Sequence, residues 1–179
     1  MIQKISLFFI ALSFLSAPAS AADAPQTPPA AIPAATAKEL TVGGIKNTSP
    51  TQTVPSLISR EAAIEPGKPF MLAVQLEHTP GWHSYWENPG DAGLATTLTW
   101  TLPAGFTAGN INWPAPQLFR EGPLAVYGYH DTVFLPVTIT PPAALDPNES
   151  YEMKVKAEWL VCKDICLPES TEMSLTLPV

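Results

Sequence analysis

Two cysteines are the residues of this sequence whose type and spacing best suit chemistry. Cys162 and Cys166 lie four positions apart. A bridge between them would close a loop of about five residues and stabilise a fold by ~2 kcal/mol, against ~4.7 kcal/mol for a hundred-residue loop. Short, exposed bridges are more often the labile or catalytic ones. The spacing therefore favours thiol–disulfide exchange, in which an external thiolate attacks one sulfur and the other cysteine resolves the mixed disulfide.

Two other roles for the cysteine pair stay open at this point. The bridge could be structural, in a non-catalytic β-sandwich binding domain. The reduced thiolates could instead hold Cu(I) or Zn²⁺ together with a histidine, as in a periplasmic Cu(I)-binding or copper-tolerance protein. The three histidines, His78, His83 and His130, have no ligand-like spacing to one another or to a cysteine. A metal titration of the reduced protein and a measured reduction potential separate the three interpretations, because structural bridges usually lie below about −300 mV.

The N-terminus has the three regions of a secretory signal peptide. Lys4 supplies a positive charge, residues 5–15 form an apolar run, and Ala19-Ser20-Ala21 offers a small-x-small cleavage site. The run is shorter than the ~20 apolar residues that span a bilayer, so cleavage fits better than an uncleaved membrane anchor. We expect a signal peptide over residues 1–21, a mature chain from about Ala22, and no stable membrane insertion after cleavage. An exported chain meets an oxidising compartment such as the periplasm, where paired thiols form disulfides.

Composition divides the mature chain into two parts and excludes several partners. Residues 22–55 are rich in Pro and Ala and have no hydrophobic period, which predicts a disordered, flexible leader. Residues 56–179 alternate apolar and polar residues between turn residues, which predicts one folded domain. The chain carries 9 Lys and Arg against 16 Asp and Glu, a net charge of −7. Such an acidic surface argues against nucleic acid and anionic lipid as partners.

The pattern of this domain predicts an all-β fold. Strands are expected at Phe70–Glu77, Thr97–Leu102, Val133–Thr140, Tyr151–Val161 and Thr171–Leu177. Pro-Gly pairs, among them Pro89-Gly90, indicate turns between strands. Short strands at this spacing predict an antiparallel β-sandwich. Cys162 then closes one strand, Cys166 opens the connection to the last strand near a hairpin tip, and Pro168 marks where regular pairing stops.

Several motifs, in order along the chain, resemble a known family. They are the segments Gly81–Gly93, Ile111–Pro116 and Leu135–Ile139, and the cysteine segment Trp159–Cys166 followed by Pro and Glu. Over about residues 57–179 the sequence resembles the N-terminal periplasmic domain of DsbD, and most closely its ScsB-type variant. The resemblance implies an immunoglobulin-like sandwich that acts as a thiol–disulfide oxidoreductase, and this chemistry needs no cofactor. A membrane-embedded or thioredoxin-like electron donor would reduce the domain, which would in turn reduce an oxidised periplasmic protein.

The resemblance also assigns site residues. The two catalytic cysteines of the family fall on Cys162 and Cys166, and Cys166 takes the role of the attacked, more accessible sulfur. A tyrosine-rich strand beside the cysteines maps by order onto residues 81–86, and a loop that caps the disulfide maps onto residues 118–124. The residues expected to shape the site are therefore His83, Tyr85, Phe119, Glu121 and Leu124.

Other features of the sequence leave parts of this assignment open. DsbD has more residues between its cysteines than the three of this chain, which changes the turn. No transmembrane or thioredoxin-like segment is recognised in this sequence, so we expect a free-standing shuttle with separate partners or a fragment of a longer system. Phe119 and Leu124 also fit a simpler role, in which they plug the end of the sandwich. Asp91 and Glu121 are candidate proton acceptors near a thiol.

Overall fold

The computed structural model describes residues 51–179, apart from the side chain of Glu121. The predicted signal peptide and residues 22–50 of the predicted leader lie outside the described residues. The first strand, β1 (Thr53–Ser59), begins ahead of the predicted domain start at Ser56. Thr53 and Pro55 are buried and Val54 between them is exposed. This alternation is too short to be recognised next to a proline-rich segment.

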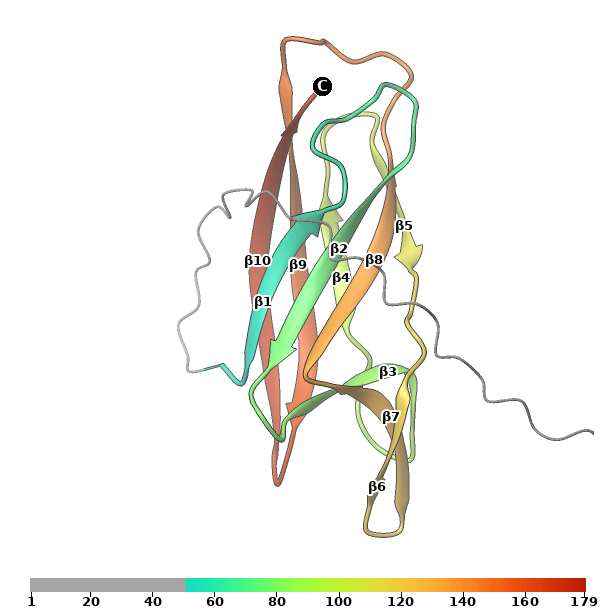
Figure 1. Ribbon diagram of the computed structural model, residues 1–179, viewed down its shortest axis with the longest axis vertical. Coiled ribbons are helices and arrows are strands. Elements are labelled where there is room, and N and C mark those ends of the chain that lie inside the picture. The colour runs from blue at the N-terminus through green and yellow to red at the C-terminus, as the bar shows by residue number, and fades with distance from the viewer. Residues whose placement is uncertain (1–50) are drawn as a thin grey trace, which may run out of the picture. The chain divides into compact units, whose positions relative to one another are not determined.

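All regular structure in this part of the chain is β-strand (Figure 1). After β1 the strands are β2 (Phe70–His78), β3 (His83–Gly90), β4 (Thr97–Thr101), β5 (Thr107–Ile111), β6 (Gln117–Glu121), β7 (Leu124–His130), β8 (Thr132–Thr140), β9 (Ser150–Cys162) and β10 (Cys166–Pro178). The five predicted strands are present as β2, β4, β8, β9 and β10. Between residues 51 and 179, no helix has the length and apolar character needed to cross a membrane.

The strands form two antiparallel sheets that pack as a sandwich. One sheet has the order β1-β2-β8-β5, and the other has the order β10-β9-β3-β7-β6, with β4 also paired to β9. An isolated parallel bridge joins Tyr85 to Ala95. This architecture confirms the predicted immunoglobulin-like antiparallel β-sandwich.

The core lies between the two sheets and follows from strict alternation along the strands. In β9 the residues from Met153 to Val161 alternate between buried apolar side chains and exposed or half-buried ones. Burying one large apolar side chain contributes roughly 1.5–3 kcal/mol. A slip of one residue would turn the whole apolar set of β9 towards solvent, so the core fixes the strand register. That register also fixes which residues lie opposite the cysteines.

Strand β10 is longer than predicted because pairing begins at Cys166 and not at Thr171. Pro168 lies inside the ladder, opposite Leu160. The interpretation of Pro168 as the end of regular pairing is therefore wrong. The physical reason is that β10 is an edge strand, and an edge strand tolerates a proline where the missing N–H would have faced away from the sheet.

The turn predicted at Pro89-Gly90 is also wrong. Strand β3 continues through both residues, and its register with β7 shifts between Tyr85 and Gly90. Such a bulge leaves backbone groups outside the regular ladder, and a proline without an N–H fits there.

Residues 118–124, predicted to be a loop, form most of a hairpin instead. Strands β6 and β7 stay in register as far as Glu121 opposite Leu124, which leaves only Gly122 and Pro123 for the turn. Gly122 has a φ of 60°, a conformation that glycine favours at the first position of a two-residue hairpin turn. The Gly-Pro pair therefore marks a tight turn between two strands and not a longer irregular segment.

Two hairpins lie at the same end of the sandwich. In Figure 1 the β9–β10 turn and the β6–β7 turn both point towards the bottom of the view, and β3 runs between them. The indole N–H of Trp159 ties the β9–β10 hairpin to the other sheet. It donates hydrogen bonds to Oγ1 of Thr53 (3.2 Å) and Oε2 of Glu169 (3.1 Å).

Candidate redox site at the cysteine hairpin

The two cysteines occupy the strand ends that meet in the β9–β10 hairpin. Cys162 is the last residue of β9, Cys166 is the first of β10, and the two lie directly opposite each other. Their Cα atoms are 4.1 Å apart and their sulfurs form a disulfide. The N–H of Lys163 donates a hydrogen bond to the carbonyl of Ile165 (3.0 Å) and closes the turn. The predicted position of the pair at a hairpin tip is confirmed.

The two cysteines differ in exposure. Cys162 is only 1% exposed and packs with Tyr85 and Val126 in a small apolar cluster. Cys166 is exposed, and the neighbouring tip residue Ile165 is 61% exposed. A molecule that approaches from solvent therefore meets Cys166 first.

Four side chains that can do chemistry form one row across four strands. Cys166 of β10 lies opposite Cys162 of β9, Cys162 lies opposite His83 of β3, and His83 lies opposite His130 of β7. Directly opposite residues of an antiparallel pair project from the same face, with Cβ atoms about 4.5–5.5 Å apart. The row therefore lies on one face of the sheet, where the ring centroids of His83 and His130 are 5.5 Å apart.

Tyr85 reaches the disulfide from β3. Its hydroxyl oxygen lies 3.8 Å from Sγ of Cys166, and the residue is almost fully buried. Gly93 sets the position of the ring, because a Cβ at Gly93 would overlap the ring atoms of Tyr85. The structure thus places both His83 and Tyr85 beside the cysteines, as the family resemblance implied.

The residues expected on the cap lie in the β6–β7 hairpin, and only one of them reaches the cysteine cluster. Phe119 is half-buried and packs against the cluster that contains Cys162. Its ring centroid is 5.3 Å from that of His83 and 4.2 Å from that of His130. Leu124 is exposed at the start of β7 and is not among the residues that pack on this cluster. Glu121 ends β6 opposite Leu124.

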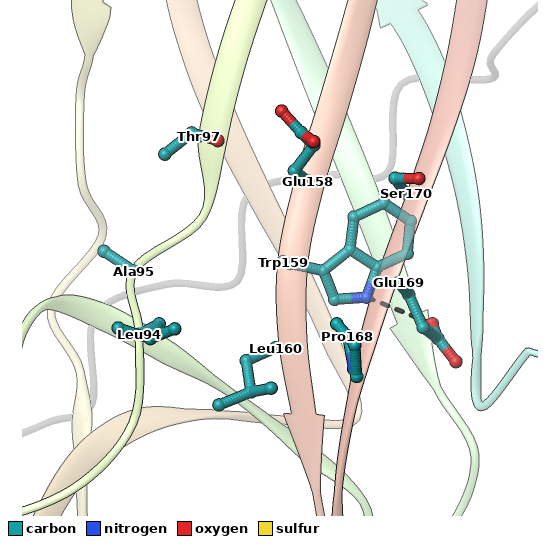
Figure 2. A pocket seen from close by; sticks show the side chains of 9 residues that line it. All are labelled: Leu94, Ala95, Thr97, Glu158, Trp159, Leu160, Pro168, Glu169 and Ser170. Atoms are coloured by element: carbon teal, nitrogen blue, oxygen red, sulfur yellow. Dashed lines mark hydrogen bonds between the residues drawn. The ribbon is translucent and has the colours of Figure 1, made fainter.

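A groove of about 580 Å³ runs along the outer face of β9 and β10. Figure 2 shows Leu160 and Pro168 on these strands, with Leu94 on the segment before β4. Leu160 lies two residues from Cys162 and Pro168 two residues from Cys166, so these groove residues share a strand face with the cysteines. Leu94 is 67% exposed. Apolar surface therefore continues from the disulfide into the groove.

The charged and metal-binding groups around the site are few. Lys163 and Asp164 in the turn are both exposed. Within residues 51–179 no three His, Cys, Asp or Glu side chains are arranged to hold a metal ion. Burial lowers the pKa of His78, and its hydrogen bond to the backbone of Asp131 opposes that shift. The Nδ1 atom of His78 lies 2.8 Å from the carbonyl oxygen of Asp131.

Sequence reasoning missed two residues that organise this site. The sequence suggests His130 only as a candidate metal ligand, yet it packs against His83 and Phe119. Gly93 belongs to the Gly81–Gly93 motif, and the sequence does not show that it makes room for Tyr85. Val126, Tyr127 and Tyr129 are residue types that favour strands, and they could have predicted β7. No local signal could have shown that this strand pairs with β3.

Comparisons with known proteins place this geometry in a family. The family model described as "Thiol:disulfide interchange protein DsbD, N-terminal" matches residues 54–178. Among solved structures, the fold resembles the N-terminal periplasmic domain of ScsB from Proteus mirabilis, with a TM-score of 0.57 and 16% sequence identity. The match covers 76% of this chain and 51% of the ScsB chain, so this chain spans about half of that structure. No curated protein matches the sequence. Because the family model covers most of the chain and the whole cysteine hairpin, the chain belongs to the family of DsbD N-terminal domains.

Proposed function

We propose that this protein is a periplasmic thiol–disulfide exchange domain that relays reducing equivalents through a reversible Cys162–Cys166 disulfide. The observation that carries the proposal is the unequal exposure of the two cysteines, since Cys166 is exposed and Cys162 is 1% exposed. A bridge across the end of one hairpin restricts little of the unfolded chain, so stabilisation explains it poorly. Exchange chemistry requires one sulfur that a partner can reach, and Cys166 meets that requirement.

The exchange proceeds in two balanced steps. A thiolate of the electron donor attacks Sγ of Cys166, a new intermolecular disulfide forms, and Cys162 leaves with the electron pair of the broken bond. A second thiol of the donor then displaces Cys166, so the donor becomes oxidised and the domain holds two thiols. Run in reverse on an oxidised periplasmic protein, the same steps return the domain to its disulfide form.

The partners follow from this chemistry. The donor must present a dithiol, as a membrane-embedded or thioredoxin-like protein does, and the acceptor must present a disulfide that is reached at Cys166. The exposed Ile165 and Leu94 lie beside Cys166 and along the groove, and apolar surface of this kind suits contact with another protein. Phe119 would act as a cover over the cysteine cluster that moves when a partner binds.

A pair of single-cysteine variants tests the proposal. Cys162→Ser keeps the exposed sulfur and Cys166→Ser keeps the buried one. Each is mixed with a thioredoxin that lacks its second cysteine and is activated as a mixed disulfide with a chromophoric thiol. We expect Cys162→Ser to form the protein–protein disulfide rapidly on a non-reducing gel and Cys166→Ser to form little. Equal rates for the two variants would contradict the assignment.

A redox titration separates exchange from a structural bridge. The wild-type protein is equilibrated with mixtures of reduced and oxidised glutathione, and the fraction of dithiol is measured by alkylation. We expect a reduction potential above about −300 mV, whereas stable structural bridges usually lie below it. A bridge that stays oxidised in every glutathione mixture would contradict the exchange function and support a structural role for the disulfide.

A further inference from the structure

In the proposed exchange, the buried sulfur of Cys162 must take the negative charge when the disulfide breaks. When a thiolate attacks Cys166, the leaving sulfur belongs to Cys162, which is 1% exposed and lies among apolar side chains. Burial in apolar surroundings disfavours a thiolate, and a poorer leaving thiol departs more slowly. Bridge opening therefore needs a nearby proton or positive charge on the side of Cys162.

His83 is the group best placed to supply that proton. It lies directly opposite Cys162 on the adjacent strand, where Cβ atoms are about 4.5–5.5 Å apart, a separation that an imidazole side chain is long enough to span. His83 is 5% exposed and its ring is held by Tyr85 (5.2 Å between centroids) and Phe119 (5.3 Å). Lys163, in the turn, is less suited as the proton donor. A Cβ atom added to Gly81 would lie 3.3 Å from Nζ of Lys163, so this amine lies beside the backbone of Gly81.

Side chains that can gain or lose a proton, once the bridge is reduced, surround His83 from the neighbouring strands. Cys162 faces it from β9, His130 from β7 and Tyr85 from β3 itself. His78, at the end of β2, interacts electrostatically with both His83 and His130. Asp131 follows His130, and its backbone carbonyl lies 2.8 Å from Nδ1 of His78. The backbone of β6 ends at Glu121. Positive charge on His130 or His83 lowers the pKa of His78.

We infer that His83 is the proton donor to the Sγ of Cys162 when the bridge opens and the acceptor of that proton when the bridge re-forms. This inference rests on the proposed exchange function. In the opening step the attacking thiolate bonds to Cys166, the S–S bond breaks, and the imidazolium of His83 transfers its proton to the departing sulfur of Cys162. The products are a mixed disulfide, a neutral Cys162 thiol and a neutral imidazole, so charge and electrons balance. In the reverse step His83 removes the proton and Cys162 attacks the mixed disulfide as a thiolate.

The pH dependence of bridge reduction tests this role. The oxidised protein is reduced with dithiothreitol from about pH 5 to about pH 9, a range that spans histidine titration. Each rate is divided by the concentration of dithiothreitol thiolate. We expect the corrected rate of the wild type to fall as His83 loses its proton. We expect His83→Phe to lose this pH dependence and to react roughly tenfold or more slowly at the acid end, since positioned proton donors contribute about 10²–10⁴-fold.

A matched variant and a second measurement keep the test decisive. His78→Asn removes a histidine that lies outside the row but interacts electrostatically with His83, so its corrected rate should still fall as the pH rises, with a shifted midpoint. If the corrected rate of His83→Phe also falls as the pH rises, the inference fails. If His83→Phe does not fold, the titration of His83 is followed by NMR in the wild type. Its midpoint should differ between the disulfide and dithiol forms, and an identical midpoint would overturn the inference.

These outcomes are distinct from a failure of the proposed function. The pH experiment uses a small thiol and measures only how the bridge opens. A wild-type bridge that shows the expected pH profile but never exchanges with a thioredoxin would refute the relay function and leave the role of His83 intact. If the bridge exchanges with thioredoxin but its pH profile does not depend on His83, the relay function stands and the role of His83 is refuted.

Discussion

Tyr85 places its hydroxyl oxygen 3.8 Å from Sγ of Cys166, although β9 lies between their two strands in the sheet. The sulfur of a disulfide carries no hydrogen, so the tyrosine O–H is the donor in this contact. A hydroxyl in this position can also donate to the thiolate that Cys166 becomes after reduction. The contact therefore joins the buried side chain of Tyr85 to the exposed residue Cys166.

The first prediction is that Tyr85→Phe makes the reduced protein less reactive at Cys166. One hydrogen bond contributes about 1 kcal/mol, which corresponds to roughly a fivefold change in an equilibrium such as thiolate formation. We expect alkylation of Cys166 by iodoacetamide at neutral pH to slow by roughly that factor. Mass spectrometry measures the rate of alkylation. Tyr127→Phe is the matched control, because Tyr127 is partly exposed on β7 and packs against Trp86. Equal slowing in both variants would show that the contact with sulfur is not the cause.

Gly93 leads to a second prediction, because its missing side chain makes room for Tyr85. Gly93→Ala has two costs, a φ of 104° that side chains rarely adopt and overlap of the new Cβ with the Tyr85 ring. Overlap of this kind costs roughly 1–3 kcal/mol, or displaces the ring. Gly122→Ala is the matched control, because Gly122 also has a positive φ but its added Cβ would meet nothing within 4 Å. We expect urea unfolding to show the larger loss for Gly93→Ala, and equal losses would remove the argument for ring overlap.

The sequence was sufficient to predict the sandwich and the cysteine hairpin, because both are local patterns. Alternation in β9 shows which of its faces is buried, and Cys162 and Cys166 are close enough in the chain to meet across one turn. The row that continues to His83 and His130 is different. It depends on the neighbours of β3, and periodicity within a strand does not specify which distant strand pairs with it. Only the family resemblance brought His83 to the site.

The cap region shows a second limit of sequence reasoning. Gly122 and Pro123 were interpreted as part of a loop, whereas they form a two-residue turn within a hairpin. Phe119 and Leu124 then alternate with their neighbours as strand residues do, so one is half-buried at the site and the other is exposed. Apolar character alone gave both residues the same role, because the face of a strand is known only once its register is known.

The third prediction concerns stability and pH. Burial lowers the pKa of His78 in the folded protein below its ordinary value of 6.5. As the pH falls below 6.5, the unfolded chain takes up a proton at this position while the folded protein does not, so the free energy of unfolding decreases. The loss is complete below the folded-state pKa. We therefore expect His78 to contribute most to stability above pH 6.5.

A comparison with His78→Asn checks this sign. The asparagine amide can still donate to the carbonyl of Asp131 but cannot take up a proton. Urea unfolding is measured on both proteins at several pH values on either side of 6.5. The stability of the wild type relative to the variant should decrease as the pH falls. A constant difference across this range would show that His78 titrates alike in the folded and unfolded states.

The last prediction is that Phe119, and not Leu124, limits access to the disulfide. Phe119 packs against the cluster that holds Cys162 and contacts the rings of His83 and His130, whereas Leu124 is exposed. Phe119→Ala should therefore speed reduction of the bridge by a small thiol, while Leu124→Ala and the exposed neighbour Leu118→Ala should leave the rate near that of the wild type. Far-UV circular dichroism confirms that each variant keeps its β-sheet content. If Phe119→Ala lowers stability but leaves the rate unchanged, Phe119 only plugs the end of the sandwich. If Leu124→Ala speeds reduction as much as Phe119→Ala does, the whole hairpin covers the site and the distinction drawn from burial fails.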